Sequence, residues 1–131
     1  MKVWLVTIGE PLPLEPESRP HRAGLLLKYF DKRNHQITWW SSTFDHVKKI
    51  NRFPFDHVEK LSKNITLSLL NGGGYSSNIS FSRIRDHMLI ANKFSLKAEN
   101  EDLPDIIICS YPTIELSEKV IDFGFQMTHY A

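Results

Sequence analysis

The chain has four short runs of mainly apolar residues, which are separated by longer segments of mixed polarity. Short runs rich in β-branched and aromatic residues are typical of strands that are buried on both faces of a sheet. The four runs therefore predict strands at residues 3–8, 37–40, 65–70 and 106–109.

Apolar residues recur at helical spacing in three of the remaining segments. This spacing predicts helices over residues 23–34, 80–98 and 112–124. Ser18 is expected to cap the first helix, because a serine hydroxyl can accept a bond from an otherwise unpaired backbone N–H. The face of the second helix that we expect to be buried holds Ile84, Met88, Ala91 and Ala98. Residues 43–64 follow neither period and receive no assignment.

Alternating strands and helices indicate an α/β protein with an open parallel sheet and helices on both faces, as in Rossmann-like folds. The 131 residues fit a single domain. Ligands of such sheets bind at the carboxyl ends of the strands, so the loops that follow the four strands are the candidate site. The chain stops after a helix with no closing strand, which favours a cut through a longer protein.

The composition of the chain limits the classes of protein to which it can belong. Hydrophobic residues make up 41% and charged residues 24% of the chain, and its net charge is +1. These values are typical of a soluble globular protein with no general affinity for nucleic acid. The single Cys109 excludes an internal disulfide and a cysteine-based zinc cluster, and it predicts a reducing, cytoplasmic environment. No signal peptide or membrane-spanning run is found in the sequence.

Two arginines lie in the segment that follows the first predicted strand. Arg19 and Arg22 lie at the start of a helix, where the helix dipole disfavours cations. They are either solvated, or they hold a phosphate or carboxylate beside free backbone N–H groups. Gly9 ends the strand and could let a phosphate approach the backbone, but the loop lacks the Gly-x-Gly-x-x-Gly pattern of a dinucleotide site.

A glycine triplet follows the third predicted strand. Residues 72–74 resemble a phosphate cradle but lack the Gly-Lys-Ser/Thr of a P-loop, so a flexible turn is the favoured interpretation. Arg83, in the helix that follows, adds a second basic helix start.

Asp45 and His46 lie just past the second strand, at the correct edge for an acid–base pair, although neighbouring Asp and His also occur on solvated loops. Metal binding would need more ligands than this pair offers, so no metal site is predicted. The nearby charges and aromatics resemble a peripheral membrane surface or an ordinary solvated one. These residues are Lys48, Lys49, Arg52, Phe53 and Phe55.

Taken together, these stretches resemble the amino-terminal domain of a GT-B glycosyltransferase of the retaining, GT4-like group, as in bacterial capsule, O-antigen or colanic-acid synthesis. Residues 2–6 resemble the opening strand of the family. Arg22 and residues 32–38 resemble its arginine, first helix and turn into the second strand, and residues 41–46 resemble its Ser-Ser-Phe-Asp-His ending. Tyr75, Asn78, Arg83, Phe94 and residues 104–112 resemble its most specific run.

The resemblance implies half of an enzyme that transfers a sugar from a nucleotide-sugar donor to a lipid-diphosphate-linked acceptor. This domain would shape the acceptor site, a second domain would grip the donor, and the isolated chain would be inactive. No other cofactor is implied, and the acceptor would bring the enzyme to the inner membrane face. Arg22 and Arg83 would hold phosphate, and Asp45 or His46 would orient an acceptor hydroxyl. The implied phosphate or substrate contacts are Gly9, Arg22, Asn78, Arg83 and Ser110.

An alternative function class stays open. A self-contained flavodoxin-like or receiver-like binding module would have the same succession of strands and helices. A receiver is expected to carry clustered acidic residues after its first strand, where this chain has only Glu10.

Overall fold

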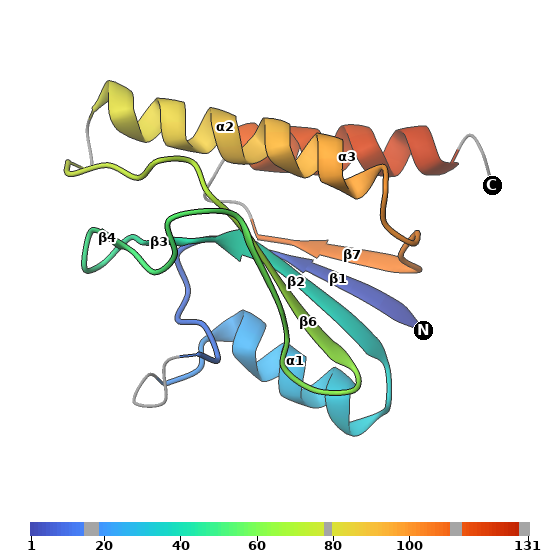
Figure 1. Ribbon diagram of the computed structural model, residues 1–131. Helices are drawn as coiled ribbons and strands as arrows, with labels where there is room; N and C mark the ends of the chain where they lie inside the picture. Colours follow the sequence, from blue (N-terminus) through green and yellow to red (C-terminus); the bar gives the residue numbers. More distant parts are fainter. Residues whose placement is uncertain (15–18, 78–79, 111–113, 129–131) are drawn as a thin grey trace.

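The structure, a computed structural model, describes residues 1–14, 19–77, 80–110 and 114–128 (Figure 1). It is an α/β protein whose main sheet has five strands in the order β5-β6-β2-β1-β7. Four of these strands are parallel, and β5 pairs with β6 in the antiparallel sense. The strands span Lys2–Val6 (β1), Gln36–Ser42 (β2), His57–Lys60 (β5), Ile65–Leu70 (β6) and Ile106–Cys109 (β7).

The helices cover both faces of this sheet, as the sequence predicted. In Figure 1, α1 lies below the sheet and α2 and α3 lie together above it. All three begin near the carboxyl ends of the parallel strands and run back across the sheet. The helices span Arg22–Lys32 (α1), Phe81–Ala98 (α2) and Ile114–Thr128 (α3).

The strand order is of the Rossmann type. The chain moves outward from β1 through β2 to β6 and then returns to the other side of β1 to form β7. In flavodoxin-like and receiver-like proteins the third parallel strand lies beside the first, whereas here β6 lies beside β2. The observed order therefore differs from that of the alternative module.

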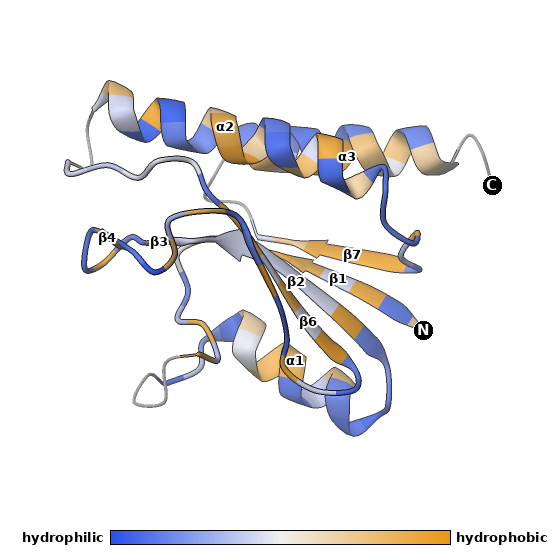
Figure 2. Cartoon of the chain, in the orientation of Figure 1, coloured by the Kyte–Doolittle hydropathy of each residue, from blue (hydrophilic) through white to orange (hydrophobic). Residues whose placement is uncertain are grey.

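Two hydrophobic cores lie on the two sides of the sheet. Because side chains alternate along a strand, Val3 and Leu5 of β1 face α1, while Trp4 and Val6 face α2 and α3. Trp4 stacks on Phe123 of α3 with ring centroids 5.3 Å apart, and Trp40 contacts Phe94 of α2 edge-on at 5.1 Å. Figure 2 shows the hydrophobic positions that follow β1, β6 and β7 through the centre of the molecule.

The unassigned residues 43–64 form a small hairpin and β5, one of the two edge strands of the sheet. The hairpin pairs β3 (Phe44–Asp45) with β4 (Ile50–Asn51). The side chains of β5 are only half-buried or exposed, since β5 is an edge strand. The sequence of the hairpin and of β5 therefore shows only a weak apolar pattern. β5 is a strand because it pairs with β6.

The predicted buried face of α2 is partly wrong. Ala91 and Ala98 are buried, but Ile84 and Met88 are about half exposed. The buried side of the first turns instead holds Asp86 and His87. A polar residue can occupy this side because the backbone N–H of Gly74 donates to the Asp86 carboxyl group at 2.9 Å, although burial still raises the pKa of Asp86.

The starts of two helices lie close to regions that the structure does not describe. Ser18, the predicted cap of α1, lies outside the described residues, and the N-cap position is occupied by His21, whose side chain makes no capping bond. The last helix was expected from residue 112, and the structure describes it from Ile114. Among the described residues, no helix has both the length and the apolar character that a bilayer span requires.

Candidate functional site

A pocket of about 320 Å³ opens at the carboxyl ends of the parallel strands. Residues from six separate segments line it: the loop after β1, the start of α1, the segment after β2, the segment after β6, the first turns of α2, and the residue after β7. These lining residues are Thr7, Ile8, Gly9, Glu10, His21, Arg22, His46, Tyr75, Arg83, His87 and Ser110.

The pocket lies where the strand order reverses. β1 sits between β2 and β7, and the segments that leave β1 and β7 contribute Gly9 and Ser110 to the lining. In open α/β sheets the crevice at this point is the usual place for a ligand, because the two loops diverge to opposite sides of the sheet.

Most of the predicted site residues come together here. Gly9, Arg22, His46, Arg83 and Ser110 all line the pocket, although they are spread along almost the whole chain. Asn78 lies outside the described residues. Asp45 lines a neighbouring hollow and not this pocket.

The carboxylate of Asp45 binds the hairpin that follows it. It accepts hydrogen bonds from the backbone N–H groups of Val47 and Lys48 at 3.0 and 2.9 Å, and it lies 3.5 Å from the Arg52 guanidinium. Burial would raise its pKa, but these N–H donors and Arg52 lower the pKa below its ordinary value. The Asp45 side chain therefore binds the hairpin, whereas the His46 side chain contacts Tyr75 of the loop after β6.

His46 is instead hydrogen-bonded to Tyr75. The Nδ1 atom of His46 lies 2.7 Å from the Tyr75 hydroxyl, and the Lys49 ammonium lies 4.9 Å above the Tyr75 ring. Burial, Lys49 and Arg83 lower the pKa of His46, so the imidazole is neutral at pH 7. Burial raises the pKa of the Tyr75 phenol, which therefore keeps its proton.

The two arginines reach the pocket from the starts of two helices. Arg22 is the first residue of α1, and Arg83 lies in the first turn of α2, where its backbone N–H donates to the Ser80 capping hydroxyl. The positive charge of Arg83 lowers the pKa values of His46 and His87. The described lining thus combines two guanidinium groups, which favour an anionic ligand, with the single carboxylate of Glu10.

The start of α1 does not present its N–H groups in the way the sequence suggested. The backbone N–H of Ala23 donates to both carboxylate oxygens of Glu10, at 3.2 and 3.1 Å. This carboxylate already occupies the positive end of the helix dipole. An anion in the pocket would therefore depend on the Arg22 side chain more than on this helix terminus.

The backbone conformation at position 9 explains why a glycine is found there. Its φ of +94° is one that other residues rarely adopt, and a Cβ built there would meet only the His46 ring, at 3.7 Å. Gly9 thus allows the loop to turn tightly beside His46.

The glycine triplet does not form a phosphate cradle. The N–H of Gly73 donates to the Asn71 side chain at 2.9 Å, and the N–H of Gly74 is taken by Asp86. A Cβ at Gly72 would lie 2.5 Å from the carbonyl oxygen of Asp86. The triplet therefore permits close packing of the loop after β6 against α2, which agrees with the turn interpretation.

Sequence reasoning missed five polar lining residues as site residues, namely Thr7, Glu10, His21, Tyr75 and His87. Two of them had a usable signal. His21 directly precedes Arg22, and His87 lies four residues after Arg83 and so shares its helix face. His87 is buried, and burial lowers its pKa. Nothing local marks Glu10 as the partner of Ala23.

The basic and aromatic residues within 48–55, which resembled either a peripheral membrane surface or an ordinary solvated one, are mostly half-buried. Phe53 stacks on His57 at 3.8 Å, Arg52 faces Asp45, and Lys49 donates to the backbone carbonyl of His46. Only Lys48 and Phe55 of the five residues are exposed.

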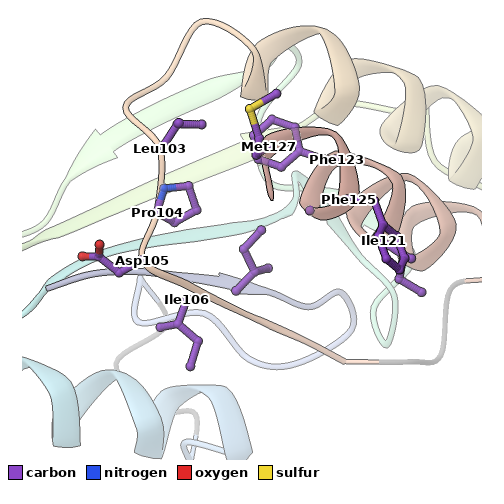
Figure 3. A pocket seen from close by; sticks show the side chains of 10 residues that line it. Leu103, Pro104, Asp105, Ile106, Ile121, Phe123, Phe125 and Met127 are labelled. Carbon is purple, nitrogen blue, oxygen red and sulfur yellow. The ribbon is translucent and has the colours of Figure 1, made fainter. Parts of the chain in front are cut away.

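A larger cavity of about 510 Å³ lies between β7 and α3 (Figure 3). Its lining is almost entirely apolar, with Leu103, Ile106, Phe123 and Met127 among the residues that face it. Its one carboxylate, Asp105, accepts the backbone N–H of Lys2 at 2.7 Å. Among the described residues, the lining of this cavity holds no arginine, lysine or histidine that could bind a phosphate.

Among the described residues, no group of three or more His, Cys, Asp or Glu side chains is arranged to hold a metal ion. Comparisons of the chain with family models, with curated proteins and with solved structures gave no match. What the site can do must therefore be inferred from its own residues.

Proposed function

We propose that this chain is the acceptor-side domain of a nucleotide-sugar glycosyltransferase, and that its pocket binds the diphosphate of a lipid-linked acceptor. One observation carries the proposal: Arg22 and Arg83, from the starts of two different helices, line one pocket at the point where the strand order reverses. The resemblance of the chain to GT-B enzymes supplies the reaction class.

The two guanidinium groups suit this ligand. Arginine binds phosphate oxygens through paired, charge-assisted hydrogen bonds, which are about twice as strong as neutral ones. Two arginines on opposite elements can hold the two phosphates of a diphosphate and neutralise most of its charge. The Ser110 hydroxyl lines the same pocket and can donate to a further oxygen.

His46 would orient the acceptor and would not act as a base. We assign the protonated Tyr75 phenol as the donor to Nδ1 of the neutral imidazole, which would leave the remaining ring proton on Nε2. An Nε2–H group is a hydrogen-bond donor, suited to a hydroxyl or phosphate oxygen. A further domain would bring the nucleotide sugar, and this chain alone would bind without transferring sugar.

Calorimetric titration of the chain with geranyl diphosphate, a short soluble lipid diphosphate, tests the pocket. Arg22→Ala and Arg83→Ala should each weaken binding by about tenfold or more, because a charge-assisted hydrogen bond contributes about 1.5–3 kcal/mol. Arg33→Ala is the matched control, since Arg33 follows the far end of α1 and stacks on Tyr29 at 3.7 Å. Equal affinity in all four proteins would refute the proposed site.

Two further measurements separate the parts of the proposal. If inorganic pyrophosphate binds as tightly as geranyl diphosphate, the pocket recognises the diphosphate alone and not the lipid.

An immunoblot of source cells tests whether the chain is half of a larger enzyme. A band well above the 15.2 kDa of this chain is expected, and a band at that size would require a separate donor-binding subunit.

A further inference from the structure

A second space, of about 270 Å³, adjoins the pocket on the side of the sheet that faces α1. We call it the apolar hollow, because two strands and one helix give it an apolar lining that includes Leu5, Ala23, Leu26 and Ile108. The hollow also shares four lining residues with the pocket, namely Thr7, Glu10, Arg22 and Ser110. A ligand in the pocket can therefore extend into the hollow.

The register of β1 and β7 forms the floor of the apolar hollow. Leu5 is paired with Ile108, and both side chains point to the α1 side of the sheet. Ala23 and Leu26 are three residues apart on α1 and so lie on one face of that helix. Ile108 and Leu26 are only partly buried, which leaves apolar surface open to a ligand.

The hollow on the hairpin side of the pocket is of a different kind. It measures about 300 Å³ and shares His46 with the pocket, but its lining also includes Asp45, Lys48 and Arg52. An alkyl chain placed there would take charged groups out of water without replacing their hydrogen bonds, which costs free energy. An apolar part of a ligand would therefore lie in the apolar hollow.

The larger apolar cavity between β7 and α3 is separate from the pocket. Among the described residues, none lines both this cavity and the pocket. The apolar hollow thus adjoins an anion held in the pocket, whereas the larger cavity does not.

We propose that the apolar hollow binds the first carbons of a prenyl chain whose diphosphate is held by Arg22 and Arg83. This inference rests on the proposed function, from which it takes the position of the diphosphate. Arg22 lines both spaces and so marks the place where the charged part of the ligand ends and the alkyl chain begins. The chain would then distinguish prenyl diphosphates from other diphosphate esters of the same charge.

Calorimetric titration with methyl, isopentenyl and geranyl diphosphate tests the apolar hollow, since these esters differ in the alkyl group and not in charge. The two prenyl esters should bind about tenfold or more tighter than methyl diphosphate, because each fully buried CH₂ group contributes about fourfold in affinity. Equal affinity for the three esters would overturn the proposal.

Leu26→Gln should remove most of this preference and leave the affinity for methyl diphosphate unchanged, because it makes the lining polar without touching the arginines. Leu25→Gln is the matched control. Leu25 is the neighbouring residue of α1, is 59% exposed and does not line the apolar hollow. Equal losses of prenyl preference from both substitutions would overturn the assignment of the chain to this hollow.

Arg83→Ala separates this inference from the proposed function. Arg83 lines the pocket but not the apolar hollow, so its loss should weaken methyl and geranyl diphosphate by the same factor. If binding needs Arg83 but chain length has no effect, the diphosphate site stands and the apolar hollow fails. If the prenyl preference persists and neither arginine affects binding, the diphosphate site fails.

Side-chain methyl ¹³C shifts locate the prenyl chain without any substitution, and so they also serve if Leu26→Gln does not fold. Geranyl diphosphate should shift the methyl signals of Leu26 and Ile108, and methyl diphosphate should not. Shifts at Ile121 and Met127 instead would place the chain in the larger cavity, and shifts at Val47 would place it beside the hairpin. Either result would overturn the proposal.

Discussion

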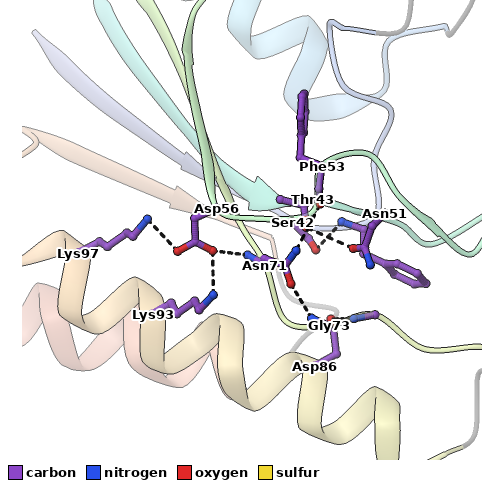
Figure 4. Close-up of polar contacts among 12 residues, drawn as sticks. Ser42, Thr43, Asn51, Phe53, Asp56, Asn71, Gly73, Asp86, Lys93 and Lys97 are labelled. Carbon is purple, nitrogen blue, oxygen red and sulfur yellow. Dashed lines mark hydrogen bonds and ion pairs between the residues drawn. The ribbon is translucent and has the colours of Figure 1, made fainter.

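Asp56 offers a quantitative test of what holds the loops of the site in place. Its Oδ1 atom accepts the backbone N–H of Asn71 at 2.7 Å and the ammonium of Lys93 at 2.9 Å, and its Oδ2 atom accepts Lys97 at 2.9 Å (Figure 4). Asn71 begins the loop that carries Tyr75 into the pocket. One carboxylate thus ties this loop to the segment before β5 and to α2.

The expected cost of Asp56→Ala is about 2 kcal/mol. A hydrogen bond to a charged acceptor contributes about 1.5 kcal/mol, and the Asn71 N–H would lose that bond. Lys93 and Lys97 are each more than a third exposed, so water screens their ion pairs and each adds only about 0.3 kcal/mol. Asp56→Asn keeps an acceptor for Asn71 and should cost about half as much.

Urea unfolding followed by tryptophan fluorescence measures these values, since Trp4 and Trp40 lie in the core beside α2. For a chain of this size about 2 kcal/mol corresponds to a decrease in melting temperature of about 8 °C. The pair Lys2–Asp102 provides a control, because the Asp102 side chain is 89% exposed. Asp102→Asn should change the free energy of unfolding by less than about 0.5 kcal/mol.

The pH dependence gives a second, independent check. Burial raises the pKa of Asp56, but the bonds from Lys93, Asn71 and Lys97 outweigh it and the net pKa is lowered. A lowered pKa in the folded state stabilises the protein above the unfolded pKa of about 3.9, and this contribution disappears as pH falls through the folded value. The difference between wild type and Asp56→Asn should be constant from pH 7 to about 5 and close below pH 4. An equally large difference at pH 3 would refute an electrostatic role for Asp56.

Three further predictions concern the loop after β6 and the single thiol. Gly72→Ala should destabilise the fold by about 2 kcal/mol or more in the same unfolding assay, because its Cβ would lie 2.5 Å from the Asp86 carbonyl oxygen; an unchanged midpoint would contradict this close packing. Ring ¹⁵N shifts should show His46 protonated on Nε2, and Tyr75→Phe should increase the Nδ1–H form; an Nδ1–H imidazole in wild type would reverse the proposed donor role. Burial raises the pKa of Cys109, so its reaction with a disulfide reagent at pH 8 should be slower than that of the unfolded chain, and equal rates would show that the thiol is open to solvent.

Local sequence determined the architecture of this protein to a large extent. The runs around Val3, Ile37, Ile65 and Ile106 form the four predicted parallel strands, and three helices cover both faces. Such runs are reliable because a parallel strand covered on both sides is apolar at most of its positions. The same topology brings the ends of these strands to one edge, which places Gly9, Arg22, His46, Arg83 and Ser110 of the predicted site in one pocket. Strand ends indicated where the site lies, and the resemblance supplied the choice of residues.

Only the tertiary structure decided which polar residues are buried and what they contact. Asp86 is buried because an N–H twelve residues earlier in the chain meets it, and β5 exists because β6 supplies its hydrogen bonds. His46 has Tyr75 as its partner, and not the adjacent Asp45, because the loop after β6 folds over the hairpin. Apolar burial follows patterns that are repeated along the chain, whereas a polar contact depends on one specific pair of distant atoms, and no local period encodes such a pair.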